Sequence, residues 1–75
     1  MSSMYNEPKF KDGWGETIKE LREHRGYSQR YFAEKLGVTQ ATVCKWEREI
    51  MVPSIEKAID MSIMLKVDVE TIFSI

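Results

Sequence analysis

The chain has 75 residues, with 11 Lys and Arg against 12 Asp and Glu, for a formal net charge of −1. This length allows one compact core, and a hydrophobic share of 43% is too high for a disordered chain. The balanced charge removes the simplest compositional argument for nucleic-acid binding, which is an overall basic chain. It also argues against a polybasic membrane-binding protein. One cysteine and one histidine form neither an intramolecular disulfide nor a Cys/His zinc cluster. We therefore expect a small domain in a reducing, cytoplasmic compartment, without metal, cofactor, membrane span or signal peptide.

Residues 1–12 show no hydrophobic periodicity, so we predict a partly flexible N-terminal arm followed by a domain over residues 13–75. Tyr5, Phe10 and Trp14 are the side chains that would order the arm by finding a groove. No alternating pattern after the arm predicts a strand, and the periodicity of the remaining chain is helical. The predicted fold class is all-α.

Five short helices are predicted, because each helical stretch has a stop and a cap. The first begins near Trp14 and is stopped by Gly26, which tolerates positive φ. The expected N-caps of the other four are Ser28, Thr39, Ser54 and Asp68. The helix after Ser54 holds Ile55, Ala58, Ile59, Ser62 and Leu65. In the last helix, Ile72 is expected to pack against Val67 across the cap.

Residues 29–48 fit two short helices joined by a glycine-containing turn, which is a helix-turn-helix. A small residue is needed where the two helices touch, and Ala33 stands there. The turn needs positive φ, and Gly37 stands there. The inward apolar positions are also filled, by Phe32, Leu36, Val38, Val43 and Trp46. This conjunction is more specific than any single glycine or alanine.

With these residues in place, 16–73 resemble the phage repressor and Cro-like helix-turn-helix family, also called the xenobiotic-response-element family. The motifs that carry the resemblance are I-K-E-L-R-E (18–23), S-Q (28–29), A-E-K-L-G-V-T (33–39), K-W-E-R (45–48), P-S-I-E (53–56) and V-D-V-E-T-I-F (67–73). The resemblance implies a compact five-helix, lambda-repressor-like DNA-binding domain of bacterial or phage origin. Its third helix, at about 40–48, would lie in the DNA major groove.

The outward side chains of this third helix are the expected base readers. Gln40 suits adenine, Lys45 suits guanine, and the methyl group of Ala41 suits the methyl group of thymine. The resemblance implies that Gln29 anchors a phosphate and braces Gln40. The further candidates for phosphate contacts are Thr39, Thr42, Arg48 and Arg30. A redox role for Cys44, which also points outward, is a further hypothesis beside the simpler interpretation of an unreactive thiol.

The resemblance also implies a structural ion pair between Arg22 and Glu47, which would fix the third helix to the first. Three positions depart from the family pattern, because Glu49 and Lys66 stand where glycine is usual and Ser62 stands where alanine is usual. Glutamate takes positive φ less easily than glycine.

Charge is unevenly distributed along the chain. Residues 25–48 hold five basic and two acidic side chains, whereas residues 49–75 hold two basic and five acidic ones. The positive part therefore coincides with the predicted DNA-binding helices.

Residues 50–52 form an apolar loop, and members of the family commonly dimerise through this loop and the last helix. The interface candidates are Met51, Val52, Ile72 and Ile75. Packing of Ile50 or Val52 into the core is the alternative explanation for the apolar loop.

The predicted function is that of a sequence-specific regulator of transcription that binds double-stranded DNA at the nucleoid, as a repressor rather than an activator. It would bind a palindromic operator as a homodimer, with recognition helices about 34 Å apart. The alternative is an antitoxin-like or other protein-interaction module of the same fold, with DNA binding secondary. Its partner face would be the acidic residues 49–75 together with the apolar loop. An enzyme is a distant third, since His24 and Cys44 form no recognisable catalytic constellation. No small-molecule ligand is expected.

Overall fold

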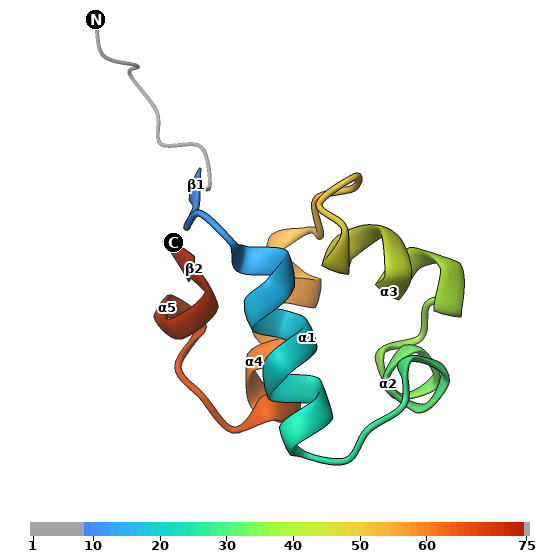
Figure 1. The fold of residues 1–75 in the computed structure, drawn as a ribbon. Coiled ribbons are helices and arrows are strands. Elements are labelled where there is room, and N and C mark those ends of the chain that lie inside the picture. The colour runs from blue at the N-terminus through green and yellow to red at the C-terminus, as the bar shows by residue number, and fades with distance from the viewer. Residues whose placement is uncertain (1–8, 75) are drawn as a thin grey trace, which may run out of the picture.

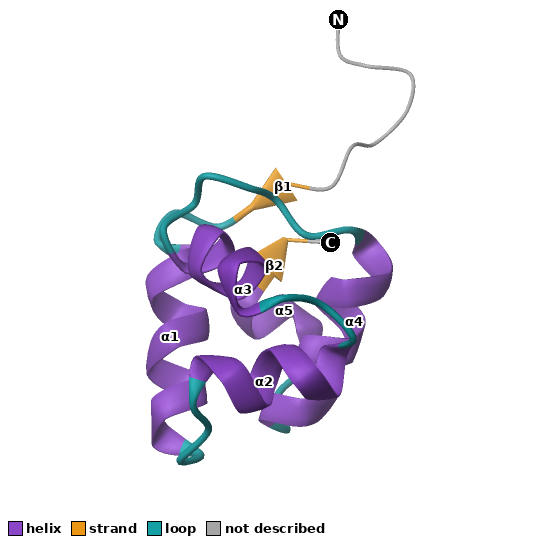
Figure 2. Ribbon diagram, turned by 90° about the vertical axis from the view of Figure 1, so that its right-hand side faces the viewer, coloured by secondary structure: helices purple, strands orange, loops and turns teal. Residues whose placement is uncertain are grey.

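The computed structural model describes residues 9–74, and within them it confirms the predicted five-helix fold. The helices are α1 (Trp14–His24), α2 (Gln29–Leu36), α3 (Gln40–Glu47), α4 (Ile55–Leu65) and α5 (Val69–Ile72). In Figure 1, α1 runs through the middle, with α2 and α3 on one side and α5 on the other. Figure 2, turned by 90°, separates α1 from α4 and shows α2 and α3 in front of them.

Three of the four predicted N-caps are present as hydrogen bonds. The hydroxyl of Ser28 accepts from the backbone N–H of Tyr31 at 3.0 Å. The hydroxyls of Thr39 and Ser54 each accept from the N–H three residues later, at 3.1 Å. Asp68 stands at the N-cap position of α5, but its side chain makes no capping bond. The cap prediction was wrong there in its chemistry, and α5 is only four residues long.

The core lies where all five helices meet. Its fully buried side chains come from every helix and from the segment after α5, and the largest are Phe32, Phe73, Ile18, Met61, Leu65, Ile72 and Val43. Trp14 and Trp46 add two large aromatic surfaces with exposed fractions of 7% and 2%. Burial of these apolar surfaces is the main force that holds such short helices together.

Two very short strands, which the sequence analysis did not predict, join the ends of the described chain. Strand β1 (Lys9–Phe10) pairs antiparallel with β2 (Phe73–Ser74), and Phe10 lies opposite Phe73. The ring of Phe10 packs edge-on against Trp14 and Phe73, at centroid distances of 4.8 Å and 4.7 Å. Residues 9–12 of the predicted arm therefore belong to the folded body, while Tyr5 lies outside the described residues.

Helix α4 buries a different face from the one that its isoleucines indicate. Its buried side chains are Ala58, Met61, Ser62 and Leu65. Ile55 and Ile59 are 47% and 44% exposed, because the period of 3.6 residues turns them away from the core. None of the described helices is both long enough and apolar enough to cross a membrane.

Candidate nucleic-acid interface

The helix-turn-helix is built from α2, the turn at residues 37–39, and α3. Gly37 ends α2 with φ at 74°, in the left-handed region that favours glycine. The next N–H, that of Val38, donates to the carbonyl of Ala33 at 3.0 Å, which completes the helix end. Ala33 itself is 2% exposed, so the small side chain stands at a tightly packed position. The turn therefore has the geometry that the sequence predicted.

Helix α3 has one buried face and one exposed face. Val43 and Trp46 are buried in the core. All three predicted base readers are exposed on the opposite side, and we call Gln40, Ala41 and Lys45 the reading face. Cys44 is half-buried.

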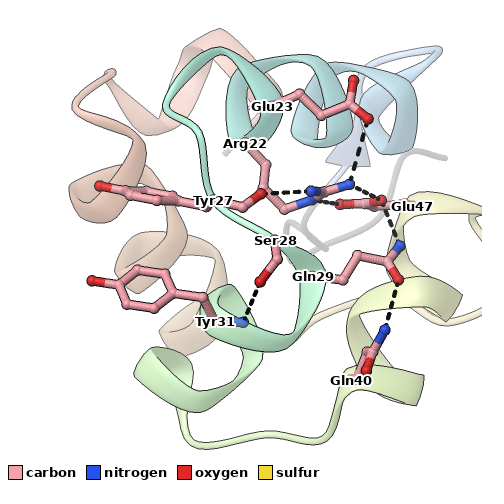
Figure 3. Close-up of polar contacts among 8 residues, drawn as sticks. All are labelled: Arg22, Glu23, Tyr27, Ser28, Gln29, Tyr31, Gln40 and Glu47. Atoms are coloured by element: carbon pink, nitrogen blue, oxygen red, sulfur yellow. Dashed lines mark hydrogen bonds and ion pairs between the residues drawn. The ribbon is translucent and has the colours of Figure 1, made fainter.

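A chain of side-chain hydrogen bonds connects the core to the reading face (Figure 3). The predicted ion pair is present, with Nε of Arg22 donating to Oε2 of Glu47 at 2.6 Å and Nη2 donating to Oε1 at 3.1 Å. Oε1 of Glu47 also accepts from Nε2 of Gln29 at 2.9 Å. Gln29 in turn accepts from Nε2 of Gln40 at 3.5 Å, a long contact at the exposed end of the chain.

The ion pair at the base of this chain is shielded from water. The side chains of Arg22 and Glu47 are 7% and 4% exposed. Arg22 also donates from Nη1 to the carbonyl of Tyr27 at 2.7 Å, so the pair spans α1, the α1–α2 loop and α3. The hydrogen bond with Glu47 raises the pKa of Arg22 above its usual range and outweighs burial, which acts in the opposite direction. A charge pair this well buried sets the position of α3 relative to α1.

The predicted phosphate ligands surround the start of the two helices and the end of α3. Thr39 caps α3, and its hydroxyl lies 3.0 Å from that of Thr42. Arg30 projects from α2 with an 80% exposed side chain, 3.6 Å from Glu34. Arg48 is exposed at the C-cap of α3. Gln29 is half-buried and is bonded to Glu47 and Gln40, as the bracing of Gln40 requires, while its phosphate contact stays a prediction.

The comparisons with known proteins assign this arrangement to a family. Residues 18–72, most of the chain, match the helix-turn-helix family. The chain belongs to this family. Its relatives include YgzD of Bacillus subtilis strain 168, an uncharacterised helix-turn-helix-type transcriptional regulator. It is 38% identical over 56 residues, which cover 75% of this chain and 85% of YgzD.

Two structures that were solved as DNA complexes are similar to this chain. SinR of Bacillus subtilis, the master regulator for biofilm formation, was solved in complex with DNA. It matches with a TM-score of 0.72 and 37% identity, covering 79% of this chain and 95% of that chain. The P22 c2 repressor, in complex with a synthetic operator, matches with a TM-score of 0.77 and covers 83% and 94%. Its identity is 22%, so this second likeness concerns the fold alone.

The two residues that stand where the family usually has glycine both adopt the conformation that glycine favours. Glu49 and Lys66 have φ of 61° and 60°. The carboxylate of Glu49 accepts from the backbone N–H of Gly15 at 2.9 Å, at the start of α1. The local N-cap of α1, Gly13, has no side chain to offer. This role of Glu49 was not predicted from the sequence, where the one signal for it is that Gly13 cannot cap α1 with a side chain.

The predicted dimer candidates separate into three groups. Met51 and Val52 are 38% and 61% exposed, which agrees with a surface contact and excludes core packing for Val52. Ile72 is 1% exposed and belongs to the core, so the structure removes it from the interface. Ile75 lies outside the described residues.

Proposed function

We propose that the chain is a sequence-specific regulator that binds double-stranded DNA and inserts α3 into the major groove. The observation that carries this proposal is the hydrogen-bonded chain from Arg22 through Glu47 and Gln29 to Gln40. These bonds hold α3 in position against α1 and leave the polar side chains of the reading face exposed. Side chains held in place before binding lose less conformational freedom when they meet a base.

The reading face supplies the chemistry for direct readout. The amide of Gln40 suits a two-bond contact with adenine, and the bond to Gln29 orients it. The ammonium group of Lys45, one turn further on, suits guanine O6 and N7. Ala41 presents a methyl group between them, and a thymine methyl group is its expected neighbour.

Backbone contacts come from the side chains around the reading face. Arg30, Arg48 and the hydroxyls of Thr39 and Thr42 are the proposed phosphate ligands, together with Gln29. The N-termini of α2 and α3 add free N–H groups and the positive end of each helix dipole. These contacts set the register of the domain on DNA without reading sequence.

We further propose that the chain acts as a repressor on a palindromic operator, bound as a homodimer. One eight-residue recognition helix contacts few bases, so a two-fold pair doubles the sequence information. Occupancy of the operator alone blocks transcription, which requires no further protein surface. The likeness at 37% identity to SinR, solved with DNA, supports the DNA-binding part of this proposal.

The test is selection of binding sites from a random pool of duplex DNA with the purified wild-type chain. We expect enrichment of a consensus with two-fold symmetry and half-sites one helical turn apart. A folded, monodisperse chain that enriches no sequence at low salt would overturn the proposal, because even weak specific binding is strongest there.

A further inference from the structure

Among the described residues, most of the exposed large apolar side chains lie in one stretch of the chain. Seven large hydrophobic side chains are exposed among the described residues, and six of them lie between residues 50 and 63. Three of the six repeat every fourth residue along α4, which places them on one face of the helix. We call Ile55, Ile59 and Ile63, which are 47%, 44% and 68% exposed, the α4 stripe. Contiguous apolar surface of this kind marks an interaction site.

The fold itself does not need the α4 stripe. The opposite side of α4 already anchors the helix, since Ala58, Met61 and Leu65 are each at most 1% exposed. At its N-terminal end, Lys57 donates from Nζ to the carbonyl of Leu36 at 2.6 Å, which ties α4 to the end of α2. The α4 stripe therefore remains available for a contact outside the domain.

We propose that the α4 stripe binds a second copy of this chain, with the two α4 helices packed antiparallel about a two-fold axis near Ile59. This arrangement sets Ile55 of each copy against Ile63 of the other, so the α4 stripe of one copy covers the α4 stripe of the other. An interface of this type is self-complementary, because the same patch serves both copies. The inference rests on the proposed function, in which a palindromic operator requires a two-fold dimer.

The charges beside the α4 stripe favour this orientation. Glu56 lies in the first turn of α4 and Lys66 is its C-cap, and both side chains are exposed. In the antiparallel pair, Lys66 of one copy lies within about one helical turn of Glu56 of the other, which is about 6 Å along the axis. A parallel pair would instead set Glu56 against Glu56 and Lys66 against Lys66. The attraction between Glu56 and Lys66 thus favours the antiparallel pair. Because of the two-fold axis, this attraction occurs twice in the dimer.

Sedimentation equilibrium of the purified full chain tests the interface. We expect a monomer–dimer equilibrium for the wild type. Ile59→Asp raises the dissociation constant at least about 100-fold, because a carboxylate replaces apolar surface at the centre. Glu56→Lys and Lys66→Glu each raise it about tenfold, and the combined variant returns to within about threefold of the wild type. Glu20→Lys, on the exposed side of α1, makes the same charge change as Glu56→Lys and is expected to leave the dimer unchanged.

Three results would overturn the inference, provided that circular dichroism shows each variant folded. They are a wild type that stays monomeric at several hundred micromolar, an Ile59→Asp variant that dimerises normally, and a combined reversal that restores nothing. Binding to the selected DNA distinguishes this failure from failure of the proposed function. If the chain binds specific DNA but its self-association is unaffected by these substitutions, only the α4 interface is wrong. If the chain dimerises but binds no DNA, the proposed function is wrong.

Discussion

The carboxylate of Glu49 bonds to the backbone N–H of Gly15 at 2.9 Å, and thereby caps α1 from 34 positions further along the chain. Glu49 directly follows the C-cap of α3 and adopts a φ of 61°. An unfavourable backbone conformation is thus combined with a bond that links α1 to the segment leaving α3. Together with the Arg22–Glu47 pair, this bond fixes the C-terminal end of α3 to α1.

Replacing each of the two left-handed residues by glycine separates backbone strain from the cap. Lys66→Gly is expected to stabilise the fold by about 1 kcal/mol, since glycine adopts positive φ without a steric penalty. Glu49→Gly gains the same relief but loses a helix cap that contributes about 1 kcal/mol, so its net effect is near zero. Urea unfolding at a concentration that keeps the chain monomeric measures both values. Equal stabilisation by the two substitutions would show that the Glu49 cap contributes nothing.

Gly15→Ala is expected to destabilise the domain by about 2–3 kcal/mol. A Cβ at this position would lie 2.5 Å from the backbone carbonyl oxygen of Glu47, which is too close for any real contact. Either α1 or the end of α3 has to move. Glu16→Ala, at the adjacent exposed position, serves as the control and is expected to change stability by less than about 0.5 kcal/mol. Thermal or urea unfolding that finds the two substitutions equivalent would contradict the close approach of α1 and α3.

A double-mutant cycle on the ion pair is expected to show strong coupling. Arg22→Ala and Glu47→Ala each leave a buried charge without its partner, which destabilises by about 3–5 kcal/mol. The double variant loses much less than the sum of the two, because neither charge remains. Additive losses would show that Arg22 and Glu47 do not stabilise the fold as a pair.

The same coupling is expected to persist at alkaline pH. The pKa of Arg22 is raised above its usual range in the folded state. Its stabilising charge is therefore fully present below the pKa of the unfolded state and is lost only as the pH rises through the pKa of the folded state. The coupling energy measured at about pH 7 and at about pH 9 is therefore the same. A decrease at the higher pH would contradict the assigned direction of the shift.

The salt dependence of DNA affinity distinguishes arginines that contact phosphates from side chains that read bases. Arg48→Ala and Arg30→Ala are each expected to reduce the slope of log affinity against log salt by about one, with an unchanged consensus. Lys19→Ala, on the exposed surface of α1, removes the same charge away from α3 and is expected to change the slope little. Fluorescence anisotropy titrations on the selected duplex at several salt concentrations provide these slopes. An altered consensus for Arg48→Ala would instead make Arg48 a base reader.

Local signals made the helices predictable from sequence. The hydroxyls of Ser28, Thr39 and Ser54 and the left-handed Gly37 act within three or four residues, so their spacing alone locates α2, α3 and α4. The split of α3 into a buried and an exposed face follows for the same reason, from Val43 and Trp46.

Contacts between distant segments were not predictable in this way. The pairing of Phe10 with Phe73 and the bond from Gly15 to Glu49 join residues whose proximity exists only after folding. Ile72 and Ile59 show the same limit, because hydrophobicity alone does not tell which isoleucine fills the core. The packing of α5 buries Ile72, which is 1% exposed, whereas the packing of α4 leaves Ile59 44% exposed.

Base reading by Gln40 and Lys45 of α3 is tested by site selection with two variants. The wild-type chain, Gln40→Ala and Lys45→Ala are each selected against the same random duplex pool. We expect each variant to lose preference at its own position of the half-site and to keep the rest of the consensus. A consensus that stays identical in both variants would contradict readout by these side chains.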